Sequence, residues 1–325
     1  MRVFKRITAF ILFNLLVLLG LQFLLCPPAV YEKQVAACQE GDYDSIIIGT
    51  SYGKNLLPEF LPEGGSVCNL SRPRVPLVDF SYIVKEINKH TPLKRVYYDI
   101  SVSYWDGSYG EPNRINMMKI LSGREQLSYF FRVLTTLSYN DFFFRYELDT
   151  PSLTAIPATV KAKISSLFQE QEPKVYTVPE SRPGNTMGQI FDKVDFSPDQ
   201  VQQTTLDAFD DLVHYCEENG IELVIYINAY PEERLLTEDM GVVHDYFAEL
   251  LRSYCLTLYD MNYVKHEYFP RDTDEYLDLD GHMLRSLAQR QTEMLTTLIT
   301  AENPDLYFET SYRDVLASLK AGAPD

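Results

Sequence analysis

The sequence predicts an α/β fold: a three-layer α/β/α, flavodoxin-like arrangement around a mainly parallel sheet of five strands. Short apolar runs of strand type alternate with amphipathic segments of helical period, and this order is typical of parallel sheets covered by helices. The run 45–51 is apolar on both faces, as in a strand buried on both sides. At 325 residues the chain can bury a large core.

Each expected strand is bounded by turn residues, and each expected helix carries apolar residues at helical spacing. Ser197 is the expected N-cap of one helix and Gly220 its stop signal. In chain order we expect strand 45–51, strand 66–71, helix 77–90, strand 93–101, helix 197–220, strand 221–231, helix 242–255, strand 256–262, helix 281–302 and one further helix in the tail.

The alternation lapses between about 102 and 196, where aromatic, partly helical stretches and proline-rich loops replace it. We interpret this region as a helical and loop insertion on the sheet and not as a domain with its own core. The expected organisation is therefore an N-terminal anchor over 1–28 followed by one domain over 29–325.

The N-terminus carries three basic residues, followed by an apolar run from Ile7 to Cys26. Such a run is long enough to span a bilayer of ~30 Å as a helix, and basic residues before it orient the body outward. We therefore expect a single-pass, uncleaved transmembrane anchor with an extracytoplasmic body. A cleaved signal peptide is the alternative, while the lipoprotein-like stretch VAAC at 35–38 lies too far from the apolar run.

The formal net charge of −17 argues against binding to nucleic acid, which requires clustered Lys and Arg. Neither the cysteines nor the histidines have metal-ligand spacing, so no metal or other cofactor is expected. Beyond Cys26, the thiols allow two pairings outside the membrane, Cys38–Cys68 and Cys216–Cys255, and free buried thiols are an equal alternative.

Polar side chains follow the strands at the edge where ligands of open α/β sheets bind. They are Ser51 after the first strand, Asn69, Ser71 and Arg72 after the second, Asp99, Ser101 and Ser103 after the third, Asn228 and Tyr230 after the fourth, and Asp278, Asp280 and His282 after the fifth.

A serine hydroxyl becomes a useful nucleophile only beside a base, usually a histidine that a third group orients. Ser51 with His282 as base and Asp280 as orienter would supply these parts, and the Ser51 amide would donate to an oxyanion. Asp278 is interpreted as a surface or capping carboxylate. Arg72 and Arg74 would bind an anionic substrate group or neutralise an acidic rim, and Trp105 with its neighbouring tyrosines would line a sugar cleft or belong to the core.

The block DSIIIGTSYGKN at 44–55 together with LDLDGHM at 277–283 resembles the SGNH (GDSL-type) hydrolase superfamily. The closer likeness is to its membrane-anchored branches that modify cell-surface polymers, DltD-like and alginate-acetylation proteins, over roughly 44–101 and 197–298. The second block of that family contributes a glycine to the oxyanion hole and the third an asparagine. Here the stand-ins would be Asn69, Arg72, Ser101 and Ser103.

The resemblance implies a serine esterase or O-acyltransferase that acts on cell-envelope polysaccharide or teichoic-type polymer through an acyl-enzyme. It also implies a membrane-bound O-acyltransferase as partner. The alternative is a catalytically inactive envelope protein of the same fold that binds glycan or such a partner. A nucleotide or phosphoryl-transfer enzyme is disfavoured, because the sequence has no GxxxxGK[ST] loop.

Overall fold

The computed structural model describes Phe10 and Phe13, residues 30–73, 75–102, 105, 117–136, 177–182 and 196–322. The chain divides into two compact units, one of 1–36 with 114–175 and one of 37–113 with 176–325. Apart from Phe10 and Phe13, the expected anchor over 1–28 lies outside the described residues, as does most of the insertion at about 102–196. No helix of the described part is long and apolar enough to cross a membrane.

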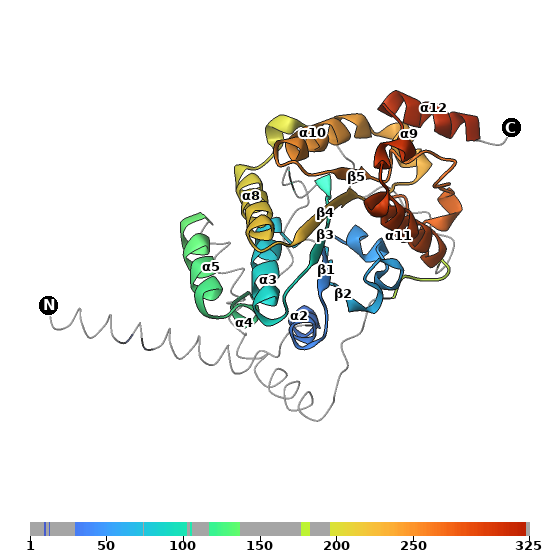
Figure 1. The fold of residues 1–325 in the computed structure, drawn as a ribbon. Helices are drawn as coiled ribbons and strands as arrows, with labels where there is room; N and C mark the ends of the chain where they lie inside the picture. The colour runs from blue at the N-terminus through green and yellow to red at the C-terminus, as the bar shows by residue number, and fades with distance from the viewer. Residues whose placement is uncertain are drawn as a thin grey trace. The chain divides into compact units, whose positions relative to one another are not determined.

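The larger unit contains a five-stranded sheet in the order β2-β1-β3-β4-β5, and all four pairings are parallel, which confirms the predicted α/β class (Figure 1). The chain order of the strands reverses between β1 and β3, and ligands of such sheets bind beyond the carboxyl ends at this point. The strands are β1 Ser45–Ile48, β2 Val67–Asn69, β3 Arg95–Asp99, β4 Glu222–Ile227 and β5 Leu258–Asp260.

Helices cover both faces of this sheet, as its alternating side chains require (Figure 1). On one face Tyr98 packs against Phe209, a residue of α8, with ring centroids 6.4 Å apart. On the other face Ile47 and Tyr97 belong to one core cluster with Leu287, a residue of α11. The helices of this unit are α3 Leu77–His90, α8 Gln203–Glu218, α9 Glu232–Thr237, α10 Met240–Ser253, α11 Arg285–Thr300 and α12 Tyr312–Gly322.

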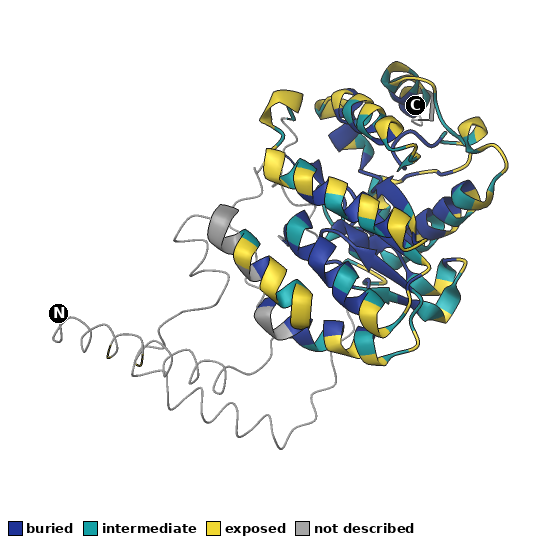
Figure 2. Cartoon of the chain, turned by 60° about the vertical axis from the view of Figure 1, so that its left-hand side comes forward, coloured by how far each residue is buried: buried dark blue, intermediate teal, exposed yellow. Residues whose placement is uncertain are grey.

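Each of these helices buries one side and exposes the other, which Figure 2 shows as bands of dark blue and yellow along them. Two helix starts differ from expectation. Ser197 precedes a 3-10 turn, η5 (Pro198–Gln200), and α8 begins only at Gln203 because Val201 is extended. The last long helix begins at Arg285 and not at Gly281, because residues 276–283 form a closed loop.

In the smaller unit the structure describes two helices, α4 (Met117–Ile120) and α5 (Gly123–Thr136). Tyr129 of α5 is buried, whereas Leu127 and Phe131 are exposed. A further helix, α2 (Val30–Glu40), crosses the boundary between the two units, and its last turn belongs to the larger one.

Short 3-10 turns connect β1 to β2. The other strands that follow one another in the chain are joined by longer helical crossovers. They are η1 Tyr52–Asn55, η2 Pro58–Phe60 and η3 Gly64–Ser66. Leu56, Leu57 and Leu61 from this connection are buried in the same core as α11. The segment after Ser51 is therefore packed against the sheet, although it contains no long helix.

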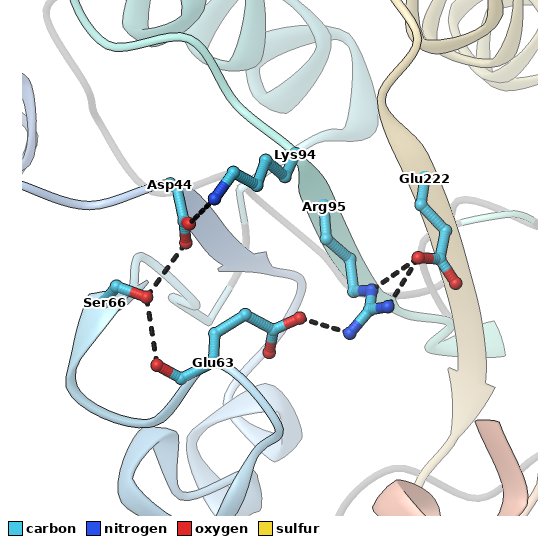
Figure 3. Close-up of a pocket in the computed structure, with 6 residues that line it drawn as sticks. All are labelled: Asp44, Glu63, Ser66, Lys94, Arg95 and Glu222. Atoms are coloured by element: carbon cyan, nitrogen blue, oxygen red, sulfur yellow. Dashed lines mark hydrogen bonds and ion pairs between the residues drawn. The ribbon is translucent and has the colours of Figure 1, made fainter. Parts of the chain in front are cut away.

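At the amino ends of the strands, a shallow pocket is lined by charged groups that pair with one another (Figure 3). The Arg95 guanidinium lies between the carboxylates of Glu63 and Glu222, and it also donates to the Tyr97 hydroxyl (3.1 Å). Lys94 pairs with Asp44 at 2.8 Å. Because these charges neutralise each other, the pocket is interpreted as an ion-pair network that joins β1, β3 and β4.

Removing the Arg95 guanidinium should destabilise the fold, because Glu63 and Tyr97 would keep partly buried polar atoms without their donor. We expect Arg95→Met to lower the free energy of unfolding by about 1–3 kcal/mol in chemical denaturation. Lys94→Met is the matched control: the Lys94 side chain is 77% exposed, and its loss should leave the denaturation midpoint unchanged. Equal effects of the two variants would contradict a special role for Arg95.

Candidate active site

The loop after β1 passes so close to β3 that its first residue must be glycine. Gly49 has a φ of +139°, and a Cβ on it would lie 2.6 Å from the Asp99 Cβ. A side chain at this position would clash and would also strain the backbone. Because Gly49 has no side chain, the chain passes from β1 directly to Thr50 and Ser51, beside the end of β3.

Asp99 is fully buried at the end of β3 and holds this loop through a hydrogen bond. The Thr50 hydroxyl donates to Asp99 Oδ2 at 2.9 Å. Burial raises the pKa of Asp99 to about 7, although the Thr50 hydroxyl and the amides of Thr50, Gly53 and Asn228 oppose the shift. Asp99 therefore supports the serine loop as a carboxyl group that is easily protonated.

Ser51 lies at the start of η1 in the α region (φ −61°, ψ −26°) and is partly exposed. Its carbonyl accepts from the Lys54 amide at 3.3 Å. Its hydroxyl caps no helix and makes no hydrogen bond to any described residue. Among the described residues the Ser51 amide is likewise without an acceptor, so both groups remain available to a substrate.

The opposite wall of the site is the loop that carries His282. The loop is closed by the Leu277 amide, which donates to the His282 carbonyl (2.6 Å), and by a bridge between Tyr276 and Met283. Gly281 reverses the chain with a φ of +109°, and a Cβ there would lie 2.8 Å from the Tyr230 ring. This turn brings residue 278 back beside residue 282.

Asp278, and not Asp280, is the carboxylate that orients the His282 ring, so the sequence-based choice of Asp280 is wrong. Asp278 Oδ2 lies 2.8 Å from His282 Nδ1, and its Oδ1 accepts from the amides of Gly281 (3.1 Å) and His282 (3.2 Å). Asp280 is buried, and its carbonyl accepts from Arg234 (2.7 Å). The reason is the turn at Gly281, which the spacing of Asp and His along the sequence does not predict.

The Asp278 carboxyl is poised to remain ionised. Burial raises its pKa, but the hydrogen bonds from the His282 ring and from two amides outweigh burial, and the net pKa lies below its usual value. With Nδ1 directed at this carboxylate, the ring presents Nε2 as its basic nitrogen. Nε2 has no hydrogen-bond partner among the described residues.

Ser51 and His282 are brought to the same edge of the sheet, but no hydrogen bond joins them in the described structure. Their connection runs through Tyr52, whose ring centroid lies 5.0 Å from that of His282. Apo sites often hold such groups apart until substrate arrives. The geometry therefore shows an oriented histidine and an unbonded serine hydroxyl at one edge of the sheet.

A buried amide network joins the serine segment to the histidine loop. Asn55 donates to Asn228 Oδ1 and to the Gly281 carbonyl, both at 3.0 Å, and accepts from the Met283 amide (3.2 Å). Gln291 of α11 donates to Asn228 Oδ1 (2.8 Å) and accepts from the Ala229 amide (2.9 Å). Because each side chain has partners on other segments, the two halves of the site are held in register.

An aromatic and cationic wall lies behind the histidine. The Arg234 guanidinium lies 4.3 Å from the centroid of the Tyr230 ring and pairs with Glu238 at 3.0 Å. Tyr230 meets the Tyr52 ring edge-on at 5.8 Å. Burial, followed by the charge of Tyr230, raises the pKa of Tyr52 well above its usual value, so Tyr52 stays neutral. Sequence analysis missed Arg234, because nothing local links it to the loop that it supports.

The stand-ins expected from the second block hold the loop and do not face a substrate. Both hydrogens of the Asn69 amide are used, on the carbonyls of Gly53 (2.9 Å) and Leu56 (3.1 Å). The Ser71 amide donates to Asn69 Oδ1 (3.0 Å), and the Arg72 amide donates to the Gly49 carbonyl (2.9 Å). In this structure the Asn69 side chain and the amides of Ser71 and Arg72 are therefore engaged within the loop.

A hydroxyl that sequence analysis did not single out as a donor is present instead. The Ser71 Oγ is buried without a hydrogen-bond partner among the described residues. It lies so close to Gly53 that a Cβ there would come within 2.2 Å of it. Ser71 is thus a spare donor beside the serine segment.

The remaining residues that the sequence suggested for the site have different positions in the structure. Ser101 is buried at the end of β3, and Ser103 and Arg74 lie outside the described residues. Trp105 is fully buried against Phe209 and Phe247, so it belongs to the core and not to a sugar cleft. Within the described part of the chain no cluster of His, Cys, Asp and Glu could hold a metal ion.

Two cations flank the serine segment. Lys54 follows Ser51 in η1, and Arg72 is tied through its amide to Gly49. Burial and the charge of Arg72 lower the pKa of Lys54, and both side chains make further interactions, so neither is an unpaired cation.

Comparison with known proteins assigns no family: no family model matches the chain, and no curated protein matches it significantly in sequence.

The two site carboxyls predict opposite pH effects on stability. Asp99 holds its proton up to about pH 7 in the folded chain, compared with 3.8 as the ordinary value, so stability should fall as pH rises between these values. Asp99→Asn should remove this slope, which is at most ~1.4 kcal/mol per pH unit. Asp278→Asn is the control, since a lowered pKa gives stability that is lost only in acid. Parallel denaturation profiles of wild type and Asp99→Asn from pH 4.5 to 7.5 would refute the assignment.

The amide network predicts a strong contrast between two glutamines of α11. Gln291→Leu leaves the buried Ala229 amide without an acceptor, so we expect a loss of about 1–3 kcal/mol in the free energy of unfolding. Gln289, on the same helix, is partly exposed and among the described residues bonds only to Glu293, so Gln289→Leu should cost less than ~0.5 kcal/mol. Urea denaturation of both variants measures this, and similar losses would count against the network.

Proposed function

We propose that the chain is an extracytoplasmic serine esterase or O-acyltransferase of SGNH type, acting on cell-envelope polysaccharide or teichoic-type polymer. The observation that carries the proposal is the 2.8 Å contact between Asp278 and His282 Nδ1, at the strand edge that also carries Ser51. The finer fold belongs to the same proposal: a flavodoxin-like, three-layer domain with a helical insertion and an N-terminal transmembrane anchor in the cell membrane.

In this mechanism the Ser51 Oγ attacks the acyl carbonyl carbon and His282 Nε2 accepts its proton. Asp278 keeps the proton of Nδ1 in place and stabilises the charged ring. The alkoxide or sugar leaving group then takes the proton from Nε2, and the acyl group remains on Ser51. Water or a polymer hydroxyl, deprotonated by the same Nε2, attacks the acyl-enzyme and restores Ser51.

The oxyanion that forms needs donors, and two are at hand. The Ser51 amide is without an acceptor among the described residues, and the Ser71 hydroxyl is buried and unbonded there. One backbone and one side-chain donor would stabilise charge less well than two fixed amides. This favours slow hydrolysis of simple esters and transfer to a well-bound polymer.

A membrane-bound O-acyltransferase as acyl donor is proposed from the family resemblance alone.

A catalytically inactive envelope protein is the second candidate, and one observation favours it. Ser51 and His282 make no hydrogen bond to each other, and the amides of Ser71 and Arg72 are occupied. Such a protein would bind glycan or a membrane partner without forming an acyl-enzyme.

Hydrolysis of p-nitrophenyl acetate and labelling by a fluorophosphonate test the catalytic proposal. We expect weak turnover by wild type, its loss in Ser51→Ala, and a loss of roughly 10²-fold or more in Asp278→Asn, because the ring tautomer is no longer held. Asp280→Asn is the matched control and should retain activity within roughly tenfold, since the carboxylate that contacts His282 Nδ1 is that of Asp278.

Two results would contradict the proposed catalytic function. If Asp280→Asn lost more activity than Asp278→Asn, the orienter would be misassigned. If wild type neither turned over the ester nor took the label, while still binding an acidic envelope polymer, the inactive binding protein would replace the enzyme.

A further inference from the structure

Two thiols from separate elements of the larger unit contact each other. Cys38 lies in the last turn of α2, and Cys68 is the central residue of β2. The Cys68 thiol lies close enough to raise the pKa of the Cys38 thiol, and burial adds to this shift. Cys38 is fully buried and Cys68 is partly exposed.

The backbone explains why they meet. The Gly41 amide donates to the Ala37 carbonyl (3.0 Å) and ends α2, so the chain turns back toward β1. The Asp44 amide then donates to the Ser66 carbonyl (3.1 Å), immediately before β2. In the register of β1 and β2, Cys68 pairs with Ile46. The end of α2 is thereby fixed beside the edge strand.

The direction of the Cys68 side chain follows from strand alternation. Its neighbour Val67 points into the core cluster that includes Leu287 of α11. Cys68 therefore points to the opposite face of the sheet, where it meets Cys38. Thiols already in contact need only a small side-chain rotation to reach the S–S separation of about 2.05 Å.

We propose that Cys38 and Cys68 are a disulfide-forming pair that ties the end of α2 to strand β2. The bond would matter mechanically, because β2 is a three-residue edge strand with a partner on one side only. The next residue, Asn69, holds the carbonyls of Gly53 and Leu56 behind the serine segment. A crosslink at Cys68 would therefore restrain one support of the site.

Formation requires a disulfide oxidant, either oxidised glutathione or a disulfide oxidoreductase. The partly exposed Cys68 thiolate attacks one sulfur of the oxidant, giving a mixed disulfide and releasing one thiolate. The Cys38 thiolate then attacks the Cys68 sulfur and releases the second. Two electrons pass to the oxidant, and the two protons of the protein thiols end on its reduced sulfurs.

The other described cysteines are internal controls. Cys216 is buried in α8 with Lys85 as its charged neighbour, and Cys255 is exposed after α10 with a φ of +57°. All four described cysteines, Cys38 and Cys68 included, are free thiols in this structure.

The test uses the full chain in a mild detergent, incubated with oxidised glutathione, denatured in the presence of an alkylating reagent and digested. We expect a linked peptide that contains Cys38 and Cys68. Adding a reductant to the oxidised protein should lower Tm by roughly 5–10 °C, because a closed loop of about 30 residues is released. Cys255→Ser should show the same shift on reduction, whereas Cys68→Ser should show none.

Alkylation of both thiols after oxidation, with no linked peptide, would overturn the proposal. So would an equal effect of reductant on wild type and Cys68→Ser. If Cys68→Ser does not fold, the peptide map and the reductant shift of wild type decide alone. Because the buffer supplies the oxidant, the result depends neither on where the chain resides nor on whether Ser51 is catalytic.

Discussion

The arrangement of the site depends on the hydrogen bonds of one buried side chain, Asn228 at the end of β4. Its Oδ1 accepts from Asn55, four residues beyond Ser51, and from Gln291 of α11. Its Nδ2 donates to the carbonyls of Ala229 (2.8 Å) and Gly281 (3.2 Å), the latter one residue before His282. A buried amide is costly unless its partners are all in place, so this group penalises displacement of either loop. Further along the chain, Asn262 donates to the Asn228 carbonyl (3.1 Å) and so links the network to β5.

The surroundings of two carboxyl groups in the site shift their pKa values in opposite directions. Asp99 is buried beneath the serine loop, where desolvation dominates and the protonated form is favoured. Asp278 is partly open to solvent and accepts from a ring and two amides, so the ionised form is favoured. Neighbouring carboxyls with separated pKa values take separate roles in acid–base sites. In the proposed enzyme, Asp278 orients the His282 ring, and Asp99 holds the serine loop through its hydrogen bond with Thr50.

The oxyanion side of the site is the less complete half. Backbone amides that would serve in a hydrolase are directed at Asn69 and Gly49, where they stabilise the close packing of η1 against the end of β2. The same contacts that hold the serine loop in place therefore occupy donors that an oxyanion would need. An enzyme built this way would depend on the Ser51 amide and the Ser71 hydroxyl, whereas a binding protein would need neither. This division separates the two proposed functions in physical terms.

The sequence by itself determined the α/β class, the five parallel strands and the meeting of the Ser51 and His282 segments at one sheet edge. Those features follow from local apolar period and from the rule that parallel strands share their carboxyl ends. Only the tertiary structure decided that Asp278 and not Asp280 faces His282, because the reversal at Gly281 needs the Tyr230 ring packed against it. Likewise, the roles of Asn69, Trp105 and Arg234, and the contact of Cys38 with Cys68, depend on segments far apart in the chain. Pairwise side-chain contacts of this kind are set by packing, and no pattern within a single segment carries them.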